Sequence, residues 1–307
     1  MASAVPVLEP ASKDAAAIHH LFLLVFIICL AILVVIASLV LISLKRFRAN
    51  GDMLPQQNFG SHRSEIIWAA LPVLIVIALS FISAKFIVSH EANAGDADMV
   101  VVGHQWWWEV RYPTAGAVTA DEIHIPVGRK LRVRVESADV IHSFWVPQLG
   151  PKMDMVRGHP NFVWLQADQP GTYEGACSEF CGDQHAWMRF IVIAQSETEF
   201  KQWLAQQARP AESAASEATR AGKDFFFAQS CANCHAIGAS ATATAGPDLT
   251  HLASRRQLAA GLLDNTQENL IRWLKNPQQI KPGCLMPNFG LSDQQLKELV
   301  AYLEGLR

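Results

Sequence analysis

The sequence predicts a multidomain protein made of a two-helix transmembrane hairpin, an all-β domain and a small all-α domain. Two long apolar runs lie in the first 90 residues, short alternating runs punctuated by Gly and Pro fill the middle, and helical periodicity closes the chain. Its 307 residues suffice for two or three domains of about 100–200 residues. The expected boundaries are 1–89 for the tail and two helices, 90–208 for the all-β domain, 209–216 for a linker and 217–307 for the helical domain.

The first part contains two apolar runs, at about residues 18–44 and 66–88. Each is as long as the roughly 20 residues that span a bilayer, and only Lys85 interrupts the second run, near its end, where its amine can reach the headgroups. A cleaved signal peptide is the competing interpretation of the first run, but that run is too long and has no basic region before it. The loop between the runs carries most of the nearby Lys and Arg, so it is expected to be cytoplasmic and everything from about residue 90 onward extracytoplasmic.

The charge distribution argues against nucleic acid as a partner. Residues 90–209 contain 10 Lys and Arg against 15 Asp and Glu, whereas residues 217–307 contain 9 against 8. Nucleic-acid affinity depends largely on basic groups that neutralise phosphates. A basic protein is the more natural partner for the acidic middle domain.

The middle domain carries short strand-like runs, such as 123–125, 131–135, 162–165 and 190–193, which predict a β-sandwich or barrel. It also holds a loop in which Cys177, Cys181, His185 and Met188 lie within twelve residues. One thiolate with His and Met ligands indicates a mononuclear copper site. Two thiolates can bridge a pair of copper ions, which then need a second imidazole, and His142 is the candidate. A disulfide or a zinc site is the alternative, but neither accounts for Met188.

This loop resembles, nearly residue for residue, the dinuclear copper loop called CuA in subunit II of haem–copper cytochrome c oxidases. The resemblance implies a cupredoxin-like fold and a ligand set, consisting of His142, Cys177, the backbone carbonyl of Glu179, Cys181, His185 and Met188. It also implies that the Glu179 carboxylate reaches a magnesium ion shared with the catalytic subunit.

Two further residues take roles from the same resemblance. Trp106, in a run of three tryptophans, matches a surface residue over the copper centre through which electrons enter. At least one face of this run is expected to be exposed. Glu65 matches a glutamate near a proton-uptake path of the neighbouring subunit, although a solvated carboxylate at a helix N-terminus is the ordinary interpretation.

The last domain contains Cys231-Ala-Asn-Cys234-His235, the attachment sequence for haem c, in which two thiols bind the porphyrin and the histidine ligates iron. A redox CxxC pair or half of a zinc site is the alternative. Met286 is the expected sixth ligand and His251 its rival. The segments around Pro247 and Met286 resemble class I cytochromes c, which implies that a proline carbonyl orients the proximal imidazole. Three phenylalanines before the motif, at 225–227, are expected to pack on the porphyrin.

Taken together, the chain resembles subunit II of a caa3-type cytochrome c oxidase with a fused cytochrome c domain. The resemblance implies a respiratory electron relay in a bacterial inner membrane, with the copper and haem domains on the periplasmic or outer side. The implied partners are subunit I, where oxygen is reduced in a proton-translocating complex, further membrane subunits, and cytochrome c or a similar donor. The alternatives are the CuA subunit of a nitric oxide reductase and a stand-alone membrane-tethered electron shuttle. A copper-free quinol oxidase subunit is disfavoured because every copper ligand is present.

Overall fold

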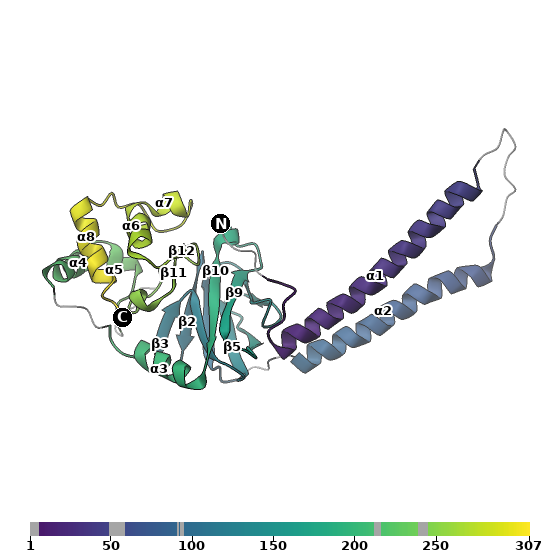
Figure 1. The fold of residues 1–307 in the computed structure, drawn as a ribbon, viewed down its shortest axis with the longest axis horizontal. Coiled ribbons are helices and arrows are strands. Elements are labelled where there is room, and N and C mark those ends of the chain that lie inside the picture. Colours follow the sequence, from purple (N-terminus) through teal and green to yellow (C-terminus); the bar gives the residue numbers. More distant parts are fainter. Residues whose placement is uncertain (1–5, 49–58, 91, 93–94, 212–215, 239–244) are drawn as a thin grey trace. The chain divides into compact units, whose positions relative to one another are not determined.

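A computed structural model describes residues 6–48, 59–90, 92, 95–211, 216–238 and 245–307 (Figure 1). The chain forms two compact units. One consists of residues 17–91, and the other combines residues 1–16 with 92–307. Part of the expected linker, residues 212–215, falls outside the described residues.

The smaller unit contains two long helices, α1 (Lys13–Arg46) and α2 (His62–His90), which run in opposite directions (Figure 1). Both are long and apolar enough to cross a membrane, and their apolar windows contain no buried residue. Bulky side chains such as Leu33 and Ile67 therefore face outward with 63% and 71% exposure, as expected where lipid is the solvent. The two predicted transmembrane helices are confirmed, and each extends beyond the apolar run by polar residues.

The middle of the chain folds into two five-stranded sheets (Figure 1). The first has the order β3-β2-β1-β5-β8 and the second β4-β10-β9-β6-β7. In chain order the strands are β1 (Met99–His104), β2 (Trp107–Tyr112), β3 (Ala117–Ala120), β4 (Glu122–Pro126), β5 (Leu131–Ser137), β6 (His142–Trp145), β7 (Met153–Met155), β8 (Asn161–Leu165), β9 (Gly171–Cys177) and β10 (Arg189–Gln195). The predicted strand runs all lie inside these strands.

Alternating side chains build the core between the two sheets. In β5, residues Leu131, Val133 and Val135 are fully buried while Arg132 and Arg134 are partly exposed, the period-2 pattern of a strand with one core face. The helix α3 (Glu197–Gln207) begins at a Ser196 capping box and packs against β3 and β4. The sheets thus form a rigid support for loops at the end of the sandwich.

The last part is helical, with α4 (Glu217–Ala228), α5 (Cys231–Cys234), α6 (Gln267–Lys275), α7 (Pro277–Ile280) and α8 (Asp293–Leu303). A short two-stranded sheet, β11 (Gln257–Leu258) and β12 (Leu263–Asp264), lies between α5 and α6 in the chain. The predicted capping box at Ser292 starts α8, whose apolar face is buried through Leu296, Leu299, Val300 and Leu303. This face packs against α4 and α6.

Candidate metal centres

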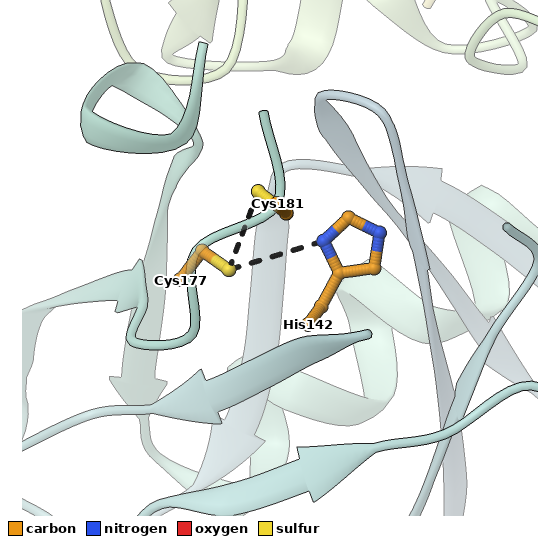
Figure 2. A group of neighbouring side chains, drawn as sticks. All are labelled: His142, Cys177 and Cys181. Atoms are coloured by element: carbon orange, nitrogen blue, oxygen red, sulfur yellow. Dashed lines mark hydrogen bonds between the residues drawn. The ribbon is translucent and has the colours of Figure 1, made fainter. Parts of the chain in front are cut away.

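The copper-loop cysteines and the upstream histidine converge at one end of the sandwich, where β6 begins and β9 ends. Ligand atoms of His142, Cys177 and Cys181 all lie within 4.8 Å of one another, and all three residues are buried (Figure 2). His142 Nδ1 lies 3.8 Å from Cys177 Sγ, and the two sulfurs are 3.7 Å apart. The first residue of β6 thereby supplies the second imidazole that the loop itself lacks.

The other predicted ligands surround the same pair of thiols. The Glu179 carbonyl oxygen lies 3.2 Å from Cys177 Sγ, His185 Nδ1 lies 3.6 Å from Cys181 Sγ, and Met188 Sδ lies 3.8 Å from the same sulfur. Two soft thiolates, two imidazoles, a thioether and a carbonyl form a donor set that suits copper. Each of the other four groups lies beside one of the two sulfurs, so all six predicted ligands are gathered in one place.

Asp139, which had no assigned role in the sequence, orients the His142 ring. Its Oδ1 lies 2.7 Å from His142 Nε2. With the carboxylate ionised, Nε2 carries the proton and donates it, so the unprotonated Nδ1 faces the thiols. Burial acts to lower the pKa of His142, but the hydrogen bonds to Asp139 and Cys177 outweigh it and raise that pKa.

The thiols also influence one another. The contact with the Cys181 thiol, aided by His142 and by the backbone around the loop, lowers the pKa of Cys177 despite its burial. The contact between the two sulfurs therefore favours the ionised form of one thiol of the pair. A thiolate is the form that binds a metal.

The haem-attachment residues line a cavity. Cys231, Cys234, His235 and Met286 all face it, and so does Phe226. Of the three phenylalanines, only Phe226 lines this cavity, while Phe227 is 52% exposed, so the expectation that all three pack on a porphyrin is wrong. Phe226 differs because its face of α4 packs against α8, with its ring 6.0 Å from that of Tyr302.

The His235 ring is oriented so that it can serve as an axial ligand. Its Nδ1 lies 2.8 Å from the Pro247 carbonyl oxygen, as the cytochrome resemblance implies. Nδ1 therefore donates, which leaves Nε2 free for iron. Burial lowers the pKa of His235 and so favours the neutral, metal-binding form.

Met286 lines the same cavity, while the rival ligand His251 is engaged elsewhere. His251 is 2% exposed, and its Nε2 lies 3.0 Å from the Arg209 carbonyl oxygen. Gln278, another residue without an assigned role in the sequence, donates from Nε2 to the carbonyl oxygens of Cys284 and Met286, at 2.7 and 2.8 Å. This amide holds the Met286 loop in place.

Three family profiles match the chain in sequence. They are the cytochrome c oxidase subunit II transmembrane domain at residues 4–86, the periplasmic domain of the same subunit at 117–195, and cytochrome c at 219–307. Cytochrome c oxidase subunit 2 of Alkalihalophilus pseudofirmus is 34% identical, with 98% of this chain and 90% of the relative covered. The chain belongs to the cytochrome c oxidase subunit II family.

A second relative agrees with this membership. The subunit 2 of Bacillus subtilis is 31% identical, with 89% of this chain and 83% of the relative covered. Among solved structures, the periplasmic domain of subunit II from Bradyrhizobium japonicum is 31% identical, with a TM-score of 0.36, and the match covers 38% of this chain and 96% of that one. A subunit II with a fused cytochrome c domain is a membrane-anchored protein that carries copper and haem c, and it assembles with subunit I.

Within this subunit II, the tryptophan run departs from expectation. Trp106, Trp107 and Trp108 are all buried, at 9%, 8% and 0% exposure, so the expectation of an exposed face is wrong. Trp106 lies in the turn before β2, and its Nε1 donates to the Cys181 carbonyl oxygen at 3.0 Å. The Trp106 ring is therefore hydrogen-bonded to the copper loop. It also lines a cavity whose other walls include residues of the haem domain.

Glu179 and Glu65 are both exposed. Glu179 lies beside Phe180 in the chain, which is 76% exposed. Glu65 lies in the first turn of α2, where its carboxylate is 3.7 Å from His62 Nδ1. Both carboxylates are therefore open to groups outside the chain.

A glycine makes room for two of the metal-binding imidazoles, those of His142 and His235. A Cβ on Gly103, inside β1, would lie 2.8 Å from His142 Cδ2, and one on Gly246 would lie 2.6 Å from His235 Cε1. A glycine within a strand signals such a close approach, and this signal could have identified Gly103 from the sequence.

We expect Gly103→Ala to weaken copper binding by about 10–100-fold, the usual effect of displacing a group that orients a ligand. The added methyl group would overlap the Cδ2 edge of the His142 ring and displace Nδ1 from its position beside the Cys177 thiol. Copper titration of the purified protein measures the loss. Gly150→Ala is the matched control, because a Cβ there would lie at an ordinary 3.7 Å from the Trp164 oxygen. Equal affinities for the two variants would contradict the expectation.

Proposed function

We propose that this chain receives electrons from a soluble donor at haem c and passes them through a dinuclear copper centre to subunit I. The convergence of two thiols with His142 within 4.8 Å is the observation that carries the proposal. Bridging thiolates let two copper ions share one electron, and a methionine-ligated haem c has a raised reduction potential. Oxygen is reduced in another subunit, so this chain needs no catalytic residues of its own.

The chain's own residues perform binding and orientation. Cys177 and Cys181 would bridge the metals, with His142, His185, Met188 and the Glu179 carbonyl completing the set. Cys231 and Cys234 would hold the haem covalently, with His235 and Met286 as axial ligands. Because most of these groups are buried or fixed by hydrogen bonds to Asp139, Pro247 and Gln278, their geometry changes little on electron transfer.

Trp106 is proposed as the point where electrons enter the copper domain. Its Nε1 reaches the carbonyl of a copper-bridging cysteine, and its ring lines the cavity that contains the haem-attachment residues. One side chain thus borders both redox sites. We also propose four segments that separate the membrane helices, the copper ligands, a linker and the haem ligands, namely 1–89, 90–208, 209–216 and 217–307.

Further proposals concern the surroundings. The exposed Glu179 carboxylate would share a magnesium ion with subunit I, and Glu65 would stand near a proton path of that subunit. The copper and haem domains would lie on the periplasmic or outer side of a bacterial inner membrane, where cytochrome c or a similar protein is the donor. The basic residues at and between the facing ends of α1 and α2, Lys45, Arg46, Arg48 and Arg63, support this orientation.

One pair of measurements tests the proposal. Optical and paramagnetic-resonance spectra of the purified complex should show both haem c and a mixed-valence copper pair. The same complex should consume oxygen in preference to nitric oxide, which separates it from a nitric oxide reductase. A complex that shows neither signature would refute the relay. Purification of this chain without a haem-bearing partner subunit would favour a stand-alone shuttle.

A further inference from the structure

The haem domain covers Trp106, the residue proposed to pass electrons to copper. Both domains belong to one compact unit, and a single cavity is lined by Trp106, Trp107 and Asp121 from the copper domain together with Cys231, His235 and Met286 from the haem domain. Trp106 is 9% exposed. A surface that would otherwise meet an external donor is occupied by another part of the same chain.

Lys281, in the haem domain after α7, crosses this boundary. It is 4% exposed, and its Nζ donates to the Trp106 carbonyl oxygen at 2.8 Å and to the Ala259 carbonyl oxygen at 3.3 Å. One acceptor thus belongs to each domain. A lysine is rarely buried unless its ammonium is paired and hydrogen-bonded, because removing it from water is costly.

Asp121 supplies the opposite charge from the copper domain. It is 8% exposed, and its Oδ1 accepts a hydrogen bond from the Trp108 amide at 2.8 Å. Burial lowers the pKa of Lys281 to about 8, and the charge of Asp121 opposes that shift. The Asp121 charge thus favours the charged form of Lys281, whose Nζ donates to a carbonyl of each domain.

Further polar contacts between the copper and haem domains lie near Lys281. Glu122 of the copper domain accepts a hydrogen bond from the Arg256 amide of the haem domain, and Arg256 Nη1 donates to Thr172 Oγ1 at 2.9 Å. The Gln184 side chain, within the copper loop, donates to the Pro282 carbonyl, next to Lys281. Polar groups of the copper domain thus meet polar and basic groups of the haem domain at several points along the boundary.

We propose that Lys281 is a positioning residue that fastens the haem domain over Trp106, so that the fused haem domain and no external protein occupies this face of the copper domain. An external donor then reduces the haem domain and has no access to Trp106. This inference rests on the proposed function for the haem and copper ligands, and it adds the residue that holds the two sites together.

Chemical labelling of the full-length holoprotein tests the wild-type contact directly. An amine-specific acylating reagent should modify the exposed Lys275 and Lys297 while Lys281 resists it, because its Nζ is buried between two carbonyls. Labelling of Lys281 at the rate of Lys297 would overturn the proposal without any variant.

The variant Lys281→Met tests the consequence, and Lys297→Met, on the exposed side of α8, is its matched control. Losing hydrogen bonds from a charged donor should raise the rate of Trp106 oxidation in hydroxyl-radical footprinting by about tenfold or more. Oxidation of the core residue Trp108 should not change, which shows that the copper domain remains folded. Asp121→Asn, which keeps an acceptor for the Trp108 amide, is the milder second variant and should also raise the rate of Trp106 oxidation.

Electron transfer gives the functional measure. One electron leaves reduced haem c, which becomes ferric, and reduces the oxidised copper pair; no proton or other reductant is involved. In Lys281→Met this transfer should slow, and direct reduction of copper by external ferrocytochrome c should appear. Unchanged footprinting and unchanged transfer would overturn the role of Lys281. Loss of the haem or copper spectrum from the wild type would instead refute the proposed function, so the two failures are distinguishable.

Discussion

We expect the Cys181→Ser chain to lose the mixed-valence signature of the copper centre. A serine hydroxyl has nearly the shape of the thiol but does not supply the soft, bridging thiolate that two copper ions need. Cys181 Sγ lies within reach of three other ligand atoms, those of Cys177, His185 and Met188, so its loss affects both metal positions. The affinity for copper should fall by more than the roughly 10–100-fold that accompanies loss of an orienting group.

Paramagnetic resonance and metal analysis of the purified complex measure this loss. Cys29→Ser is the matched control, because Cys29 is an exposed thiol in α1 and its replacement should leave the copper signal intact. The haem c spectrum should persist in both variants. A Cys181→Ser chain with the full dinuclear spectrum would show that the bridging assignment is wrong.

The metal-binding loops could be predicted because their ligands are close in sequence. Cys177, Cys181, His185 and Met188 lie within one short segment, and the CxxCH motif places three haem-binding groups in five residues. Soft ligands at such spacings are typical of metal and haem sites and of little else. The coarse fold class followed from local patterns, the length of the apolar runs of α1 and α2 and the alternation in β5, whereas the cupredoxin-like and cytochrome c folds were implied by the family resemblance.

Contacts between distant segments could not be predicted in the same way. Asp139 and Gln278 are ordinary polar residues in the sequence, and they acquire a role only once the chain brings them to His142 and Met286. Trp106 illustrates the limit, because the family resemblance assigned it to the surface, while the haem domain of this chain covers it. Burial at a boundary between domains depends on how the domains pack, which no local pattern encodes.

We expect Gly222→Ala to destabilise the haem domain by about 3 kcal/mol, the upper part of the range for overpacking a core. In an open helix this substitution would stabilise by about 1 kcal/mol, because alanine is the better helix former. At Gly222, within α4, a Cβ would lie 2.0 Å from the Glu298 carbonyl oxygen and 2.9 Å from the Tyr302 Cβ on α8. Backbone atoms cannot rotate away as a flexible side chain can, so the two helices must separate.

The melting temperature of the haem domain should therefore fall by about 10–20 °C, given that 1 kcal/mol corresponds to several degrees in a domain of this size. Lys223→Ala is the matched control, an exposed neighbour in the same helix that should change little. Calorimetry of the holoprotein, with the copper spectrum as an internal reference, separates a local effect from global unfolding. A rise in melting temperature would contradict the close contact of α4 and α8 at Gly222. The position of Phe226, which α4 places in the lining of the haem cavity, would then have to be explained in another way.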